Sequence, residues 1–259
     1  MTYVAVGAVM VVLLLAIWLT RMPNLREEDK TLQFGAAFRR LVRNRNYVWG
    51  VVAQFFYVGA QIAVWSFVIR YAMQQLHFDA VIAGLGSGAS TESIIAALRG
   101  VEPVAAGFYD FCAWIGLDDL LPRTAEQAGA TYYILSLVLF VVARFVCTGL
   151  MRFFSPRKIL MTLAVLGVAG VYGLMGISGC MSLMFPTIYS CGLRGLGPDT
   201  KIGGAGMVMA IAGAAVLTQI QGIVSDRIGS IGTAYWVPAA AFAVIVYYSI
   251  FICKEERVS

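Results

Sequence analysis

Four amide and aromatic side chains share one face of a long apolar stretch between residues 47 and 72. Their spacings of three, four and four residues place them in one line on a helix: Gln54, Tyr57, Gln61 and Trp65. Lipid cannot hydrogen-bond a carboxamide, so we expect this glutamine stripe to face protein or a wet cavity. Aromatic rings beside amides suit a sugar, because its C–H faces stack on rings while its hydroxyls hydrogen-bond to amides.

The glutamine stripe also has a plainer interpretation. Glutamines inside apolar helices commonly fasten one helix to another. The stripe alone therefore leaves two alternatives open, a sugar-binding wall and a helix-packing seam.

The residues that would carry other chemistry do not form a site in the sequence. Five cysteines occur without a CxxC motif, and the single histidine, His77, lies outside every apolar span. No nucleophile with its base and no cluster of metal ligands lies beside the spans. We therefore expect no enzyme activity, no metal and no cofactor.

The composition places the chain in a membrane. Hydrophobic residues make up 60% of its 259 residues, charged residues 13%, and the mean hydropathy is +0.80. The net charge of +5 does not point to nucleic acid, because the basic residues sit in short patches beside apolar spans. The sequence predicts an all-α integral membrane protein whose first partner is the lipid bilayer.

The apolar segments predict about seven transmembrane helices. The stretch at 47–72 would be about 39 Å long as a helix, enough for one tilted crossing of a core of about 30 Å. Of the 19 basic residues, 14 fall on one side, three on the other and two within spans. This bias puts the N-terminus in the periplasm and the C-terminus in the cytoplasm of a bacterial inner membrane. The predicted spans are 3–20, 47–72, a helix at 124–151 that starts before the membrane, two legs within 159–193, 202–224 and 235–253.

These spans divide the chain into three parts. Residues 1–20 form a transmembrane helix, 21–46 a cytoplasmic loop with an interfacial amphipathic helix, and 47–259 a C-terminal bundle. Within the bundle, 73–123 is a long periplasmic loop in which we expect short helices. Thr124 and Gln127 form a capping box that begins the next helix.

Three further features concern packing. Arg144 lies within the third span, where a costly guanidinium is expected to serve structure or gating. Gly206, Ala210 and Ala214 form a small-xxx-small face that lets helices approach closely. Residues 159–193 carry no charge and have room only for a tight hairpin, which we place near Gly173 to Gly179, with Pro186 and Tyr189 supplying a kink and a polar tip in its second leg.

Several stretches resemble the fucose:proton symporter family of the major facilitator superfamily, which includes the bacterial L-fucose permease and the glucose/galactose transporters. They are VVAQFFYVGAQIAVWSFVIRYA, SGCMSLMFPTIYS and GLRGLGPDTKIGGAGMVMAIAGAAVLTQIQGIVSDRIGS. The resemblance covers the last part of the family's pattern, from the sixth of twelve helices to the twelfth. It implies a C-terminal six-helix bundle plus the preceding helix, and a cavity for L-fucose, glucose or galactose lined by Gln54, Tyr57, Gln61, Trp65, Pro186 and Tyr189.

The resemblance also implies that something else must carry the proton. Family members place their protonatable carboxylates in the N-terminal half, and here no Asp, Glu or His falls inside a predicted span. Protons would therefore be coupled through that missing half. Two readings follow: the C-terminal half of a proton-coupled sugar symporter, or a truncated, transport-inactive fragment of one.

Overall fold

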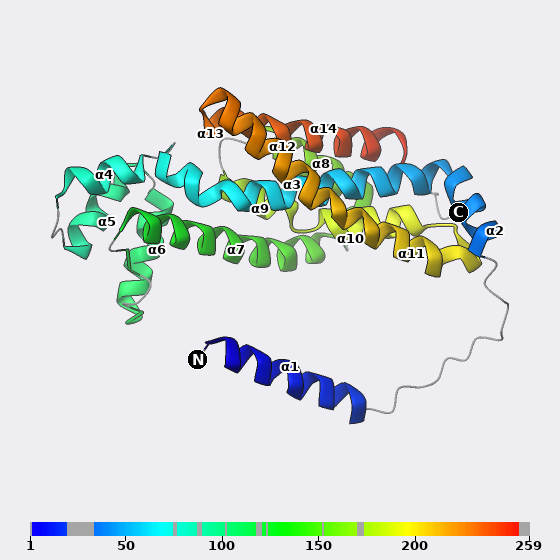
Figure 1. Cartoon of the computed structure of the whole chain (residues 1–259), viewed down its shortest axis with the longest axis horizontal. Helices are drawn as coiled ribbons and strands as arrows, with labels where there is room; N and C mark the ends of the chain where they lie inside the picture. Colours follow the sequence, from blue (N-terminus) through cyan, green and yellow to red (C-terminus); the bar gives the residue numbers. More distant parts are fainter. Residues whose placement is uncertain are drawn as a thin grey trace. The chain divides into compact units, whose positions relative to one another are not determined.

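A computed structural model describes residues 2–19, 34–74, 77–86, 90–101, 103–117, 121–122, 124–151, 153–169 and 174–253 (Figure 1). Every regular element in these ranges is a helix, which confirms the all-α class. Residues 21–33 of the predicted cytoplasmic loop, residues 170–173 with the first residue of the predicted bend, and the basic C-terminal tail lie outside them.

The chain divides into two units, Met1–Ala36 and Ala37–Ser259. In the first unit, helix α1 (Thr2–Leu19) has 18 residues and coincides with the first predicted span. Its sequence is apolar throughout and contains no charge, as a membrane-crossing helix requires. The rest of the fold concerns the second unit.

Helix α3 (Arg45–Gln74) is the central element of the second unit. It packs against α7, α10, α12 and α14, whose bounds are given below. Small residues make this possible, because Ala53, Ala60 and Ala63 are completely buried along its length. A helix that is apolar on all sides is one that protein or lipid surrounds.

The preceding helix α2 (Phe34–Arg43) is amphipathic, as predicted. Ala37 and Leu41 are buried, whereas Phe38 and Val42 are exposed. The apolar residues of α2 therefore divide between protein and the outside.

Three short helices occupy the 73–123 region, as expected from its composition. They are α4 (Phe78–Gly84), α5 (Thr91–Arg99) and α6 (Pro103–Trp114), which gather at one end of the bundle (Figure 1). Arg99 pairs with Asp110 at 2.5 Å between α5 and α6. The Tyr109 hydroxyl donates to the Ala128 carbonyl at 2.8 Å and ties α6 to the next long helix.

That helix, α7 (Ala125–Leu150), begins where the capping box predicts. The Thr124 hydroxyl accepts a hydrogen bond from the Gln127 amide at 3.3 Å. Few of its apolar side chains are covered by this chain, and Val141, Val142 and Phe145 are exposed.

The 159–193 region differs from the predicted hairpin. It forms α8 (Pro156–Ala169), α9 (Leu174–Met181) and α10 (Met184–Leu193). Gly176 and Gly179 lie inside α9, so the placement of the bend across Gly173 to Gly179 is wrong for these two residues. The break at Ser182 and Leu183 instead follows from Pro186, whose ring excludes the carbonyl four residues earlier from a helical hydrogen bond.

The last elements complete the bundle. A 3₁₀ turn η3 (Gly197–Asp199) leads into α11 (Thr200–Met209), η4 (Ala210–Ala212) and α12 (Gly213–Ile228), and α13 (Ile231–Ala234) leads into α14 (Trp236–Phe251). The predicted span 202–224 is thus one long rod with a 3₁₀ segment in its middle.

Within the described residues, four helical stretches are long and apolar enough to cross a membrane: the stretch containing α3, α7, the rod from η3 to α12, and α13 with α14. The fold is that of a multi-pass membrane protein. Helices α8, α9 and α10 are individually shorter than the roughly 20 residues that a crossing needs, so the two crossings predicted there stay a prediction.

Candidate functional site

The glutamine stripe of α3 faces α7, α9 and α10. Tyr57 is completely buried, and its hydroxyl donates to the Met181 carbonyl at the end of α9 at 2.8 Å. Its ring meets Phe185 of α10 edge to face, with centroids 6.2 Å apart. The phenol therefore joins α3 to the break between α9 and α10.

Trp65 continues the stripe two turns further along α3. Its indole nitrogen donates to the Ser178 hydroxyl of α9 at 3.4 Å, and its ring packs edge-on against Phe140 of α7 with centroids 5.2 Å apart. The ring is half-buried. Trp65 thus retains an accessible surface beside two neighbouring helices.

The two glutamines differ in their surroundings. Gln54 is completely buried, and neither its amide nitrogen nor its amide oxygen has a hydrogen-bond partner among the described residues. Gln61 is half-buried. Leaving a buried amide unpaired costs about 1–3 kcal/mol, and Gln54 is not fastened to another described side chain or backbone group.

Helix α10 contributes an aromatic platform. Phe185 and Tyr189 stack one turn apart with centroids 6.3 Å apart and planes 9° from parallel. Pro186 lies beside them in the first turn, where its missing N–H is not needed. The Tyr189 hydroxyl lies against Gly204 of α11, where an added Cβ would come within 2.8 Å of it, so the polar tip points toward α11.

Arg144 lies exposed on α7. Its neighbours Val141, Val142 and Phe145 are exposed apolar side chains. A charge in that setting needs an anionic or polar partner.

The small residues on the rod lie against the rest of the bundle, and a closer approach of two helices occurs at another position. A side chain at Gly206 would overlap the Tyr47 hydroxyl of α3, Ala210 is buried in η4, and Ala214 is partly buried against the core. The tightest approach is made instead by Gly213 and Gly59. A Cβ on Gly59 would lie 2.8 Å from the Gly213 carbonyl oxygen, and a Cβ on Gly213 would overlap the Phe55 carbonyl.

Sequence reasoning missed two buried polar groups. Gln221 of α12 is completely buried with both amide atoms unpaired among the described residues, and the Tyr248 hydroxyl of α14 is buried without a described partner. The sequence did contain a hint for Gln221, because it is an amide side chain within an apolar span. Nothing in the sequence distinguished Tyr248, because tyrosine is frequent in membrane helices.

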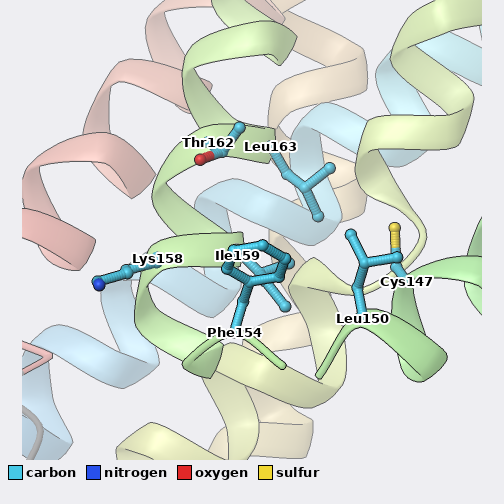
Figure 2. A pocket seen from close by; sticks show the side chains of 7 residues that line it. All are labelled: Cys147, Leu150, Phe154, Lys158, Ile159, Thr162 and Leu163. Carbon is cyan, nitrogen blue, oxygen red and sulfur yellow. The ribbon is translucent and has the colours of Figure 1, made fainter. Parts of the chain in front are cut away.

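A separate pocket of about 300 Å³ lies where α7 ends and α8 begins (Figure 2). It includes none of the predicted site residues and is lined by Cys147, Leu150, Phe154, Lys158, Ile159, Thr162 and Leu163. Among the described residues, no three His, Cys, Asp or Glu side chains gather as a metal site.

Comparison with known proteins places these features in context. No protein-family model matches the chain. An L-fucose-proton symporter of Escherichia coli is 32% identical over 265 residues, which cover 96% of this chain and 50% of the relative. A glucose/galactose transporter of Brucella abortus is 25% identical over 256 residues, which cover 98% of this chain and 53% of the relative.

A solved structure agrees with these relatives. A transporter of the major facilitator superfamily in the outward conformation superposes with a TM-score of 0.70 at 32% identity, covering 98% of this chain and 54% of the other. The chain thus spans about half the length of the proteins it matches. The predicted resemblance to one half of this transporter family is confirmed, and the relatives are transporters rather than enzymes.

Proposed function

We propose that this chain forms one wall of the sugar cavity of a proton-coupled sugar transporter, with L-fucose, glucose or galactose as the substrate. The observation that carries the proposal is the unpaired amide of Gln54, which is completely buried on the glutamine stripe. An amide used only as a helix fastener would have a polar partner on the neighbouring helix. A sugar hydroxyl supplies both a donor and an acceptor.

The other predicted sugar-binding residues fit the same role, and they differ in how accessible they are. Gln61, Trp65, Pro186 and Tyr189 are half-buried, so a sugar can reach them in this conformation. Gln54 and Tyr57 lie beneath, and a sugar reaches them once α3 moves relative to α10. This arrangement agrees with a cavity that opens and closes by relative movement of packed helices.

Proton coupling belongs to the other half of such a transporter. The membrane-crossing parts of the predicted spans contain no Asp, Glu or His, and the charges within them are those of Arg70 and Arg144. We propose that this half works with a second half that carries the protonatable groups, in the bacterial inner membrane, with the N-terminus periplasmic and the C-terminus cytoplasmic.

A second candidate is a transport-inactive fragment of such a transporter. It is favoured by the break at Ser182 and Leu183, which leaves α10, with ten residues, too short to cross a membrane on its own. The two candidates differ in whether transport returns when the other half is supplied.

The test is an uptake assay in cells that lack sugar uptake of their own. The chain is expressed alone and together with the other half of a matching transporter, and proton-driven entry of labelled fucose, glucose and galactose is measured. Uptake only in the joint expression supports the transporter half. If no uptake is seen although both halves are present in the membrane, the chain is a transport-inactive fragment.

The same assay tests the site. Gln54→Ala and Gln61→Ala are expected to weaken sugar binding while the protein still inserts into the membrane. Gln219→Ala, on the exposed side of α12, is the matched control. Unchanged sugar affinity in both stripe variants would show that the stripe is a packing seam.

A further inference from the structure

The pocket between α7 and α8 joins an apolar floor to a charged rim. Leu150, Phe154, Ile159 and Leu163 supply hydrocarbon, and its volume of about 300 Å³ is the size of a small ligand site. Figure 2 shows the Lys158 amine directed away from Leu150 and Cys147, and the Thr162 hydroxyl one helical turn from it. An occupant must therefore be apolar at one end and polar at the other.

The charge at the rim is left without a partner. Two cations follow each other in the first turn of α8, Arg157 and Lys158. Arg157 donates to the Ser249 and Ile250 carbonyls at the end of α14, at 2.8 and 2.6 Å. Lys158 is exposed and forms no ion pair within the part of the chain that the structure describes.

This placement of Lys158 opposes the helix dipole. The first turn of a helix carries a partial positive charge from its free N–H groups, so a cation there is unfavourable and an anion favourable. An anionic group bound beside Lys158 would be attracted by the ammonium, by the helix terminus and by the nearby Arg157. An anionic group at the rim of this apolar pocket would therefore complement its charge.

We propose that this pocket binds one anionic phospholipid, with an acyl chain on Leu150, Phe154 and Leu163 and the headgroup phosphate at Lys158. The surrounding surface suits a lipid, because Phe153 and Phe154 are exposed beside the pocket. The Thr162 hydroxyl lies where the glycerol esters follow the phosphate. The basic flanks place this end of α7 on the cytoplasmic side, where anionic lipids act on proteins.

The test uses the full chain in nanodiscs of phosphatidylcholine. A trace of photoactivatable phospholipid with a diazirine on its acyl chain is added, carrying either a phosphatidylglycerol or a phosphatidylcholine headgroup. After illumination, mass spectrometry locates the labelled peptides. The phosphatidylglycerol probe is expected to label residues 147–163 more strongly than the phosphatidylcholine probe, and soluble glycerol phosphate is not expected to compete.

Two variants and a control sharpen the test. Lys158→Gln should lower phosphatidylglycerol labelling roughly fivefold, the effect of one basic residue near anionic lipid. Thr162→Trp, at an exposed lining position that should tolerate the change, should fill the pocket and lower labelling by both probes. Lys201→Gln, another exposed lysine on the predicted cytoplasmic side, should change neither.

Equal labelling by the two probes, or labelling that survives Lys158→Gln at full strength, would mean ordinary lipid contact and would overturn the proposal. Loss of labelling when a second copy or the other transporter half is present would assign the pocket to protein contact and overturn it as well.

Discussion

Arg40 donates two hydrogen bonds to Asp199, both at 2.7 Å, across 159 residues of sequence. The pair joins α2 to η3, the turn that begins the rod of α11 and α12. Beside it, Leu41 is buried against Gly203 of α11. Helix α2 is therefore docked onto the bundle by a doubly hydrogen-bonded ion pair and by buried apolar side chains, and it should move with α11.

The first prediction concerns this docking. Arg40→Gln or Asp199→Asn is expected to loosen α2 without unfolding the bundle, because the Arg40 side chain is 60% exposed and lies at the edge. Hydrogen exchange of the α2 amides should become faster, while exchange in α3 stays as it is.

The double variant Arg40→Asp with Asp199→Arg should recover slow exchange, since it keeps an opposite pair. Arg39→Gln is the matched control, as Arg39 is an exposed neighbour on the same helix. Equal exchange in the wild type and Arg40→Gln would mean that the buried apolar side chains, and not the ion pair, hold α2.

A second prediction follows from the acid form of Asp199. The hydrogen bonds from Arg40 lower the pKa of this carboxyl below its usual value of about 4. A lowered folded-state pKa means that the pair stabilises α2 fully above the unfolded value and loses its effect as the pH falls through the folded value.

The measurement is exchange of the α2 amides at a series of pH values, corrected for intrinsic exchange, in the wild type and in Asp199→Asn. The difference between them should be constant above about pH 5, should begin to shrink as the pH falls through about 4, and should vanish only below the lowered pKa of Asp199. A difference that persists in acid would place the stabilisation elsewhere than in the carboxylate.

The sequence predicted the features that depend on patterns within one segment. The capping box at Thr124, four of the apolar spans and the amphipathic α2 all follow from local spacing, and each is present among the described residues. The glutamine stripe was found in the same way. Its partners on α9 and α10 were not, because which helices meet is decided by packing between distant segments.

The predicted hairpin within 159–193 also shows where local patterns fail to predict the structure. Glycines at 176 and 179 suggested a bend, yet both are helical, because glycine permits a bend without requiring one. Pro186 requires one, and the helix breaks four residues before it. Gly59 and Gly213 were overlooked because a close contact between two helices leaves no mark in either sequence until the pair is known.

A third prediction separates binding from packing at Gln54. Because its amide is buried without a described partner, Gln54→Leu removes an unpaired polar group and keeps the volume similar. The free energy of unfolding is expected to rise by about 1 kcal/mol, and sugar affinity in the joined transporter is expected to fall.

Thermal unfolding in detergent and a sugar-binding assay together decide the matter, with Gln219→Leu on the exposed side of α12 as the control. If Gln54→Leu lowers the melting temperature and leaves sugar affinity intact, Gln54 is a fastener with a partner and the binding wall lies elsewhere.

A fourth prediction tests the seam between α3 and α12, which fixes where the glutamine stripe points. Gly213→Ala would push a Cβ into the Phe55 carbonyl, and backbone atoms cannot rotate away as a side chain can. The expected cost is about 1–3 kcal/mol of unfolding free energy, seen as a lower melting temperature in detergent. Gly149→Ala in α7 meets no atom within 4 Å and should leave stability unchanged or slightly raised. If both variants unfold at the wild-type temperature, α12 stands further from α3, and the stripe is free to rotate away from α9 and α10.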